Sequence, residues 1–197
     1  MEERESLNTP MISIILPSRQ EPKIKQVVDE LEKLYNHVQI IVCNDRYSKG
    51  KGWAIRQALK EARGGLICFL DGDGDIQPKM LKRLLPYIED YDIVCGVKPI
   101  SGLWSRRILT YFSRIYLAIC FDIKVDSQTG IKLFRREAMQ EFYNDGFLFD
   151  LEIICKAKQK GFSMIEVPIE ANINRKMKLI SIWKTLKESI TLWLELR

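Results

Sequence analysis

The 197-residue sequence contains a single histidine, His37. Catalytic triads with a histidine base and metal sites built from several histidines are therefore not expected. Its five cysteines include no C-x-x-C pair and lie in or beside apolar segments, which indicates buried free thiols of a reducing compartment. No apolar run reaches the roughly 18–20 residues of a membrane-spanning helix. No cluster of Lys and Arg is dense enough to predict nucleic-acid binding.

The composition is that of an ordinary globular protein, with 46% hydrophobic and 29% charged residues. The length fits one domain over residues 1–197. Residues 1–10 are polar and acidic, so we expect a flexible N-terminus and no signal peptide. The net charge of +5 suits an anionic substrate or an acidic membrane surface, although a solvated basic surface is the commoner cause.

Short apolar runs alternate with helical patterns through the first half of the chain. Helices are predicted to begin at Pro22, Lys51 and Pro78, and the helix at Lys51 to end near Arg63. The expected strands are 11–17, 38–43, 66–70 and 92–97. Alternation of this kind predicts an α/β fold with a central, mostly parallel sheet, right-handed crossovers and flanking helices. Ligands of such sheets bind beyond the carboxyl ends of the strands, where residues 17–21, 44–45, 71–75 and 97–98 fall.

The second half is less regular. We expect a helix over 150–160 and strands over 131–134 and 163–167, with a turn at 126–130. Residues 104–120 predict an amphipathic helix that either lies at a membrane interface or packs on the core. Residues 179–197 predict a C-terminal amphipathic helix, which we expect to contact the core or a membrane-anchored partner subunit.

Three carboxylates follow the third predicted strand at alternate positions: Asp71, Asp73 and Asp75. Neighbouring anions repel one another, and a divalent cation with oxygen ligands, Mg²⁺ or Mn²⁺, would neutralise them. An EF-hand is excluded because its sixth and twelfth positions hold Ile76 and Lys82. By itself an Asp-x-Asp pattern is more often a solvated turn. Gly50-Lys51-Gly52, at a helix start, is either a tight basic entry or a phosphate contact.

Taken together, the motifs resemble family-2 glycosyltransferases with a single GT-A type (Rossmann-like) domain. The similarity is strongest to the polyprenyl-phosphate (dolichyl-phosphate) mannose or glucose synthases. It covers nearly the whole chain in order. The matching segments are Leu16-Pro17-Ser18-Arg19-Gln20-Glu21, Gly50 to Ala58, Phe69-Leu70-Asp71-Gly72-Asp73, Asp126 to Glu137, Phe149 to Glu152, Gly161-Phe162 with Glu166 to Ile169, and Arg175 with Lys178-Leu179.

The resemblance implies roles for individual residues. Asp73 and Asp126 would be catalytic, and the metal ligands would come from Asp71, Asp73 and Asp75. The acceptor phosphate would be bound by Arg106, Arg107, Arg175 and Lys178. Residues expected at the nucleotide sugar are Pro17, Glu21, Asp45, Lys51, Asp71, Gly72, Asp73, Lys98 and Lys132.

Two segments depart from the family pattern. Asn44-Asp45-Arg46-Tyr47 stands where relatives usually have Asp-Asp-Gly-Ser, and Arg19-Gln20-Glu21 stands where they have Tyr-Asn-Glu. Both segments belong to the base and ribose region. The nucleotide, GDP or UDP, is therefore left open.

The implied reaction is a metal-dependent, inverting transfer of mannose or glucose from a nucleotide diphosphate sugar to a polyprenyl phosphate. We expect it at the cytoplasmic face of the membrane, by a peripheral protein. A lipid phosphate is already an anion and needs no strong base, whereas an alcohol acceptor would need one; Asp126 is then either that base or a turn residue. The alternatives are a soluble or other lipid acceptor, a nucleotidyltransferase, or a non-catalytic nucleotide-sugar-binding module. Nucleotidyltransferases normally carry a glycine-rich loop after the first strand, and residues 17–21 contain no glycine.

Overall fold

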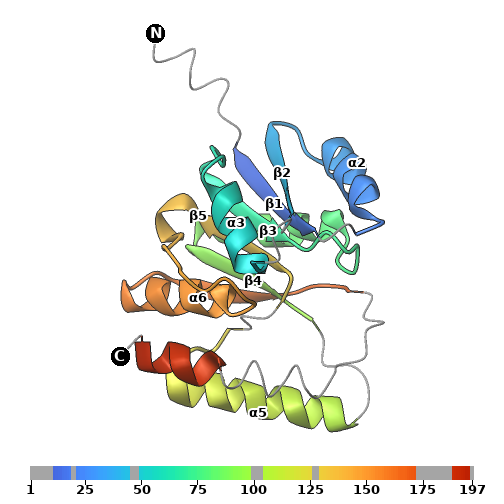
Figure 1. Ribbon diagram of the computed structural model, residues 1–197. Helices are drawn as coiled ribbons and strands as arrows, with labels where there is room; N and C mark the ends of the chain where they lie inside the picture. The colour runs from blue at the N-terminus through green and yellow to red at the C-terminus, as the bar shows by residue number, and fades with distance from the viewer. Residues whose placement is uncertain are drawn as a thin grey trace.

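The computed structural model describes residues 11–18, 21–44, 49–98, 104–125, 129–171 and 188–195, without the side chains of 104–110 and 113. Six strands form one sheet in the order β2-β1-β3-β5-β4-β6 (Figure 1). The strands are β1 (Ile12–Ser18), β2 (Val38–Asn44), β3 (Leu66–Leu70), β4 (Ile93–Val97), β5 (Ile131–Arg135) and β6 (Met164–Pro168). All six were expected from the sequence to within one residue at each end.

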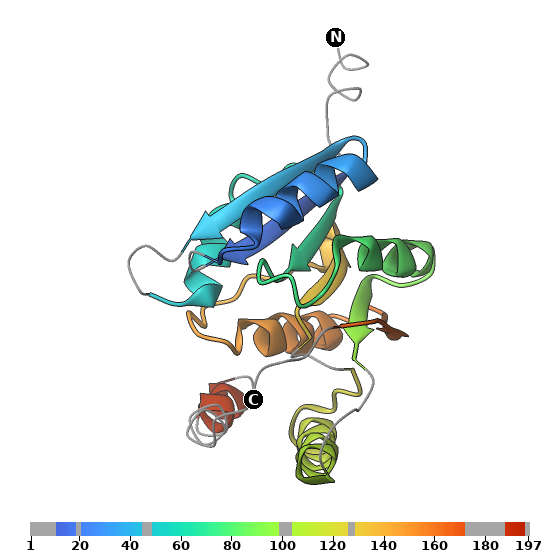
Figure 2. The same ribbon diagram turned by 90° about the vertical axis from the view of Figure 1, so that its right-hand side faces the viewer.

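Helices cover both faces of the sheet. The α-helices are α2 (Ile24–Leu34), α3 (Lys51–Leu59), α4 (Leu81–Leu84), α5 (Trp104–Phe121) and α6 (Phe149–Gln159). Three 3₁₀ helices, η1 (Pro78–Met80), η2 (Leu85–Glu89) and η3 (Arg136–Ala138), complete the described elements, and residues 188–195 are helical. One apolar cluster joins a sheet face to α3 and α6, and a second joins the other face to α2 and α4. Figure 2 shows α2 running alongside β1 and β2 on this second face.

The sheet is mostly parallel, with one reversed strand. β1 pairs in parallel with β2 and β3, and β4 pairs in parallel with β6. β5 lies between β3 and β4 and is antiparallel to both. The carboxyl ends of β1, β2, β3, β4 and β6 therefore share one edge of the sheet, but β5 separates the end of β4 from that of β3.

The inner strands β1, β3, β4 and β5 are mostly apolar and buried, because both of their faces are covered. Ile14, Ile15 and Leu16 of β1 are fully buried. Ser13 is the polar exception, and its hydroxyl donates to Gln39 Oε1 at 2.8 Å and accepts the N–H of Gly64 at 2.8 Å. A Cβ on Gly64 would lie 2.5 Å from the nitrogen of Ser13. The glycine therefore allows the chain after α3 to pass close to β1.

Two helices differ from their predicted extents. The helix expected over 51–63 ends at Leu59 as an α-helix, and its chain continues through a turn. The helix expected from Pro78 is divided into η1, α4 and η2. Pro86 lacks an N–H and cannot continue the α-helical hydrogen bonding in this segment. Tight 3₁₀ turns therefore follow Leu84.

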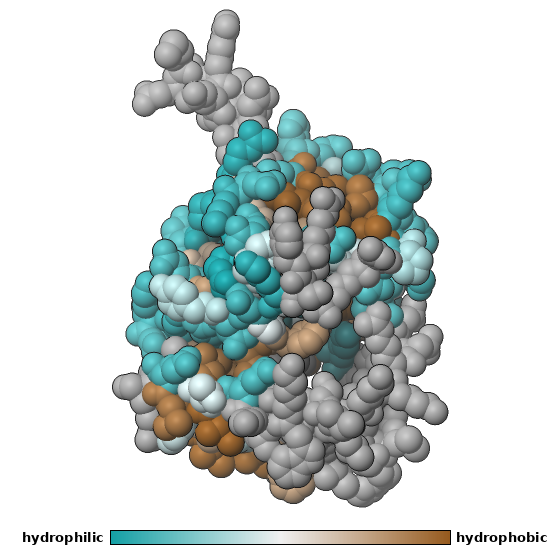
Figure 3. Space-filling view, in the orientation of Figure 1, coloured by the Kyte–Doolittle hydropathy of each residue, from teal (hydrophilic) through white to brown (hydrophobic). Residues whose placement is uncertain are grey.

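The helix α5 and residues 188–195 lie side by side at one end of the molecule (Figure 1). The hydroxyls of Tyr116 and Ser189 are 3.0 Å apart, and Leu117 and Leu192 are buried. Arg114 donates to Glu166 of β6 at 3.1 Å. Part of α5 therefore packs on the core, whereas Phe112 and Ile119 are 61% and 78% exposed. Figure 3 shows hydrophobic surface at this end.

No helix within the described ranges is both long enough and apolar enough to cross a membrane. Of the predicted C-terminal helix, residues 188–195 are helical and 179–187 and 196–197 lie outside the described residues. Residues 1–10 also lie outside them. The predicted flexibility of the N-terminus stays a prediction.

Candidate active site

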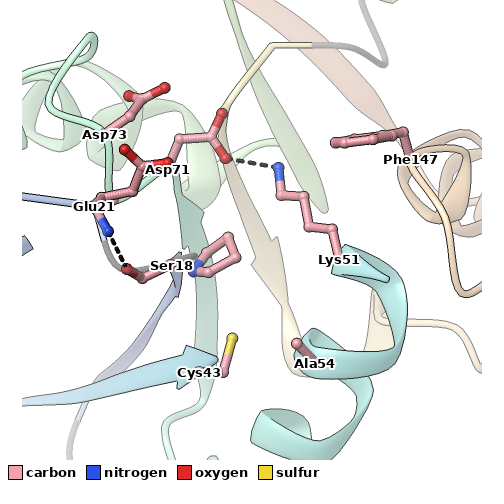
Figure 4. Close-up of a pocket in the computed structure, with 10 residues that line it drawn as sticks. Ser18, Glu21, Cys43, Lys51, Ala54, Asp71, Asp73 and Phe147 are labelled. Carbon is pink, nitrogen blue, oxygen red and sulfur yellow. Dashed lines mark hydrogen bonds and ion pairs between the residues drawn. The ribbon is translucent and has the colours of Figure 1, made fainter. Parts of the chain in front are cut away.

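A pocket of about 250 Å³ opens at the carboxyl ends of β1, β2 and β3 (Figure 4). The amino-terminal end of α3 and the segment before α6 close its other sides. It is lined by Pro17, Ser18, Glu21, Cys43, Lys51, Ala54, Asp71, Gly72, Asp73 and Phe147. The sequence predicts a site at this edge, and the structure brings together six of the residues predicted to bind the nucleotide sugar: Pro17, Glu21, Lys51, Asp71, Gly72 and Asp73.

The position of Asp71 is fixed by contacts with Lys51 and Gly130. Its N–H donates to the carbonyl oxygen of Gly130 at 2.8 Å, and Oδ1 accepts from Lys51 Nζ at 2.6 Å. A Cβ on Gly130 would lie 2.1 Å from Asp71 Oδ2, so only glycine leaves room for the carboxylate as it stands. Asp71 is thus positioned by β3, by α3 and by the turn before β5.

Lys51 is the one cationic side chain among the described residues that line the pocket. Its ammonium pairs with Asp71 and also lies 5.5 Å from the centre of the Phe149 ring. Burial lowers the pKa of Lys51, but the charges of Asp71 and Asp150 outweigh burial, and the net pKa is raised. Lys51 is therefore charged throughout the neutral range.

A second ion pair lies beneath the first. Lys132 on β5 is 1% exposed, and its Nζ lies 3.2 Å from Asp150 Oδ2 and donates to the carbonyl oxygen of Thr129 at 2.5 Å. Asp150 is in the first turn of α6, and among the buried side-chain atoms of the described residues its Oδ1 is the one without a hydrogen-bond partner. Burial raises the pKa of Asp150, against the opposing charges of Lys132 and Lys51. Positive and negative side chains alternate through the two pairs, which limits the cost of burying the charges of Lys132 and Asp150.

Asp73 and Asp75 form the turn that follows Asp71. The N–H of Asp75 donates to Asp73 Oδ1 at 2.9 Å, an arrangement typical of Asx turns. Within the described ranges, no group of three or more His, Cys, Asp or Glu is arranged to hold a metal ion. Asp71 and Asp73 nevertheless present oxygen ligands to one pocket, and Mg²⁺ usually takes only one or two protein carboxylates beside phosphate and water oxygens. These two residues therefore fit a cation that arrives with a diphosphate.

The wall of the pocket formed by Pro17, Cys43 and Ala54 has smaller and less polar side chains than the wall formed by Lys51, Asp71 and Asp73. The N–H of Glu21 donates to Ser18 Oγ at 3.2 Å, which links Glu21 to the end of β1. Cys43 lies beside Pro17 and Ala54 among the lining residues. Burial raises the pKa of the Cys43 thiol to about 11, so it is neutral at physiological pH. This wall suits the flat, partly apolar surface of a nucleobase better than a phosphate.

The glycine-rich entry of α3 is occupied by backbone contacts. The N–H of Gly52 donates to the carbonyl oxygens of Asp145 at 2.9 Å and Gly146 at 3.2 Å. A Cβ on Gly52 would lie 2.1 Å from the Asn144 carbonyl oxygen, and Gly50 has a φ of 122°. Gly50-Lys51-Gly52 was interpreted either as a tight helix entry or as a phosphate contact. The backbone partners of the Gly52 N–H agree with the tight helix entry. Lys51 alone contributes its side chain to the pocket.

Several predicted residues do not line this pocket. Asp75 and Lys98 are absent from its lining, and Lys98 follows β4, on the far side of β5. Lys132 is buried against Asp150 rather than exposed to a diphosphate. Asp45, Asp126, Arg175 and Lys178 lie outside the described residues, as do the side chains of Arg106 and Arg107. The roles of all these residues stay predictions.

Sequence reasoning missed other residues of the site. Ser18, Cys43, Ala54 and Phe147 line the pocket, and Gly130 and Asp150 shape it from behind. Ser18, Gly130 and Asp150 lay within segments that matched the family, and that match was the available signal. Phe147 carried none, because its place at the pocket depends on tertiary contacts.

Comparison with known proteins identifies the family. Residues 13–143 match the description Glycosyl transferase family 2. The chain belongs to glycosyl transferase family 2. The matched segment contains β1 to β5 together with Lys51, Asp71 and Asp73, so the pocket described above is built almost wholly from the family's own region.

Two curated proteins are similar to the chain over part of their own length. The chain is 25% identical over 136 residues to the polyprenol monophosphomannose synthase of Mycolicibacterium smegmatis, covering 62% of this chain and 49% of the relative. It is 28% identical over 196 residues to the dolichyl-phosphate beta-glucosyltransferase ALG5A of Trichomonas vaginalis, covering 90% of this chain and 59% of the relative. The chain thus spans about half to three fifths of the curated relatives it matches.

Solved structures confirm the α/β architecture of this family-2 chain. The glucosyl-3-phosphoglycerate synthase of Mycobacterium tuberculosis, in complex with Mn²⁺ and UDP-glucose, superposes with a TM-score of 0.75. The match covers 99% of this chain and 82% of that chain, at 16% identity. A complex of the same enzyme with Mn²⁺, UDP-glucose and phosphoglyceric acid has a TM-score of 0.76. The predicted mostly parallel sheet with flanking helices is therefore correct.

Proposed function

We propose that this chain transfers a hexose, mannose or glucose, from a nucleotide diphosphate sugar to a polyprenyl phosphate. The observation that carries the proposal is the convergence of Lys51, Asp71 and Asp73 in one pocket at the carboxyl edge of the sheet. The sequence relatives support a lipid-phosphate acceptor, because they are named as a polyprenol monophosphomannose synthase and a dolichyl-phosphate glucosyltransferase.

The lining of the pocket favours one orientation of the donor. The base and ribose would lie along Pro17, Glu21 and Cys43, and the diphosphate would reach Asp71 and Asp73. A divalent cation, Mg²⁺ or Mn²⁺, would supply Lewis-acid stabilisation of the leaving diphosphate there. The ammonium of Lys51 stands in the same pocket and would add fixed positive charge as the leaving group becomes more negative.

The chemistry is a displacement at the anomeric carbon. An oxygen of the acceptor phosphate supplies the electron pair for the new bond to that carbon. The bond from the carbon to the β-phosphate oxygen breaks, and the nucleoside diphosphate leaves with its electron pair, with inversion of configuration. The attacking oxygen is already anionic, so no proton has to be removed first. An alcohol acceptor would instead require a base, for which Asp126 is the candidate.

The acceptor would be delivered at a membrane surface. Exposed apolar side chains on α5 and on residues 188–195, namely Phe112, Ile119, Ile190 and Leu194, give this end of the molecule a hydrophobic surface that suits lipid contact (Figure 3). We therefore propose peripheral association with the cytoplasmic face of a membrane, either directly or through a membrane-anchored partner.

The test is a transfer assay with GDP-mannose, UDP-glucose and UDP-N-acetylglucosamine, each with polyprenyl phosphate and Mn²⁺ or Mg²⁺. Formation of a lipid-linked hexose from GDP-mannose or UDP-glucose, lost on addition of EDTA, is the expected result. Absence of lipid-linked product with all three donors would refute the acceptor. Transfer to 3-phosphoglycerate but not to the lipid would indicate a soluble acceptor. Donor binding without any transfer would indicate a binding module.

A further inference from the structure

Phe147 is an exposed aromatic side chain at the rim of the pocket. It is 59% exposed, and it is the only aromatic residue among the described residues that line the pocket. Figure 4 shows it entering from the side of Lys51 opposite to Asp71 and Asp73. Leaving a phenylalanine in water forgoes the stabilisation of burial, and its neighbours Leu148 and Phe149 are each only 1% exposed.

The backbone before Phe147 is fixed from two helices. The carboxylate of Glu152 on α6 accepts the N–H of Asn144 at 2.9 Å and that of Tyr143 at 3.1 Å. From α3, Arg56 pairs with Asp145 and donates to the carbonyl oxygen of Phe142 at 3.2 Å.

Further contacts fix the residues immediately before Phe147 and the ring of Phe149 after it. The Gly52 N–H donates to Asp145 and Gly146, and Gly146 donates its own N–H to Asn144 Oδ1 at 2.9 Å. Phe149 packs against Phe142 and Phe69 with ring centres 5.6 and 5.9 Å away. The backbone that carries Phe147 is therefore held in place before a ligand binds, which lowers the cost of ordering this part of the pocket on binding.

We propose that Phe147 is a stacking platform for the hexosyl group of the donor. This inference rests on the proposed function, because it requires a nucleotide diphosphate sugar in the pocket. With the base along Pro17 and Cys43 and the diphosphate at Asp71 and Asp73, the sugar is the next group of the donor. The side of the pocket left for it is the one beyond Lys51, where Phe147 stands.

The chemistry of a pyranose matches an aromatic ring. One face of a hexose carries C–H groups with small positive partial charge, and the face of a phenyl ring is negative. Stacking would cover the exposed ring and leave the sugar hydroxyls at its edge for polar contacts. Phe147 would then hold the anomeric carbon near Asp71 and Asp73 and would favour sugars with an uninterrupted C–H face.

The experiment compares a donor with the same nucleotide lacking its sugar. Titration calorimetry with Mn²⁺ would measure UDP-glucose against UDP, and GDP-mannose against GDP, for the wild type and for Phe147→Ala. We expect the variant to bind the preferred sugar nucleotide about 3- to 10-fold more weakly, the range of an aromatic stacking contact. Binding of the nucleoside diphosphate alone should stay within about twofold.

Three further variants separate stacking from a structural effect. Phe147→Trp should keep the wild-type affinity for the sugar nucleotide, whereas Phe147→Leu, which is apolar but has no ring face, should not. Tyr143→Ala is the matched control, because Tyr143 is a 73%-exposed aromatic of the same segment that lines a different cavity. Its loss should change neither affinity.

The outcomes distinguish this inference from the proposed function. Three results for Phe147→Ala would overturn the stacking role: equal weakening of its binding to the sugar nucleotide and to the nucleoside diphosphate, no weakening of either, or a raised KM for polyprenyl phosphate alone. In each case, hexose transfer by the wild type would still uphold the proposed function. A wild type that binds neither UDP-glucose nor GDP-mannose would overturn both.

Discussion

The ammonium nitrogen of Lys51 lies 2.6 Å from Oδ1 of Asp71, so a residue of the chain itself neutralises the first acid of the acidic turn. A free divalent cation must compete with this ammonium for the carboxylate. A cation that arrives with a diphosphate does not face the same penalty, because the phosphates give Lys51 new anionic partners.

Lys51→Met should therefore bind Mn²⁺ more tightly in the absence of nucleotide, by about tenfold for about 1.4 kcal/mol of removed competition. Electron paramagnetic resonance of free Mn²⁺ during a titration measures this directly. Lys49→Met, which removes a lysine that contacts the Trp53 ring 5.2 Å away, is the control and should leave the affinity unchanged. Weaker Mn²⁺ binding by Lys51→Met would contradict the competition.

Gly130→Ala should impair the site more than the fold. The new Cβ would meet Asp71 Oδ2 at 2.1 Å, and the carboxylate would have to leave its position. We expect at least about tenfold weaker binding of the nucleotide sugar with Mn²⁺, equivalent to about 1.4 kcal/mol, and only a small change in melting temperature. Gly65→Ala is the matched control, because nothing lies within 4 Å of a Cβ at that position. Unchanged donor binding in Gly130→Ala would show that the Asp71 carboxylate can move freely.

Asp150→Asn should destabilise the protein. The change removes the negative charge that faces the ammonium of Lys132, which is 1% exposed, and leaves that cation buried without a counter-ion. Breaking a buried pair from one side costs about 3–5 kcal/mol, which urea denaturation would detect as a lowered midpoint. The double variant Lys132→Met/Asp150→Leu should recover most of the loss. A single variant as stable as the wild type would show that the pair contributes little.

Cys43 reports on occupancy of the pocket through its pH-dependent reactivity. Burial raises the pKa of its thiol to about 11, against a smaller lowering by Lys51. Because only the thiolate reacts, alkylation by iodoacetamide should be slow at pH 7 and rise about tenfold per pH unit up to pH 9.5. Peptide mass spectrometry separates Cys43 from Cys120, the other cysteine that is not fully buried.

Nucleotide should slow the alkylation of Cys43 and not that of Cys120. UDP or GDP with Mn²⁺ is added before the reagent, and each peptide is followed over time. Fast alkylation of Cys43 at pH 7 would contradict the raised pKa of its thiol. No protection of Cys43 by nucleotide, or equal protection of both cysteines, would contradict the location of the nucleotide beside Cys43.

The sequence was most informative where local patterns determine structure. The apolar runs that end at Pro17, Cys43 and Leu70 predicted three strands and, after the third, the acidic turn, because the strands of a covered parallel sheet are mostly apolar. Strand order could not be obtained in this way. Nothing in the pattern of Ile131 to Arg135 says that β5 runs antiparallel between β3 and β4, which separates Lys98 from the acids.

The remaining features of the site depend on contacts between distant segments. Asp150 is 79 positions from Asp71 in sequence, and Phe147 reaches the pocket only because Glu152 and Arg56 hold the segment before it. The interruption of the helix predicted from Pro78 has a local signal in the sequence, since Pro86 is disfavoured in the interior of an α-helix. Contacts such as Gly130 against Asp71 require the folded chain.

The most direct test is the yield of lipid-linked hexose from Mn²⁺, polyprenyl phosphate and a radiolabelled donor, GDP-mannose or UDP-glucose, for the wild type and Asp73→Asn side by side. The account predicts labelled lipid with the wild type and at least about a 100-fold loss with Asp73→Asn, the loss of one strong electrostatic contact in the transition state. The variant's circular dichroism and melting temperature should be unchanged. Full activity in Asp73→Asn, or no labelled lipid from the wild type with either donor, would contradict it.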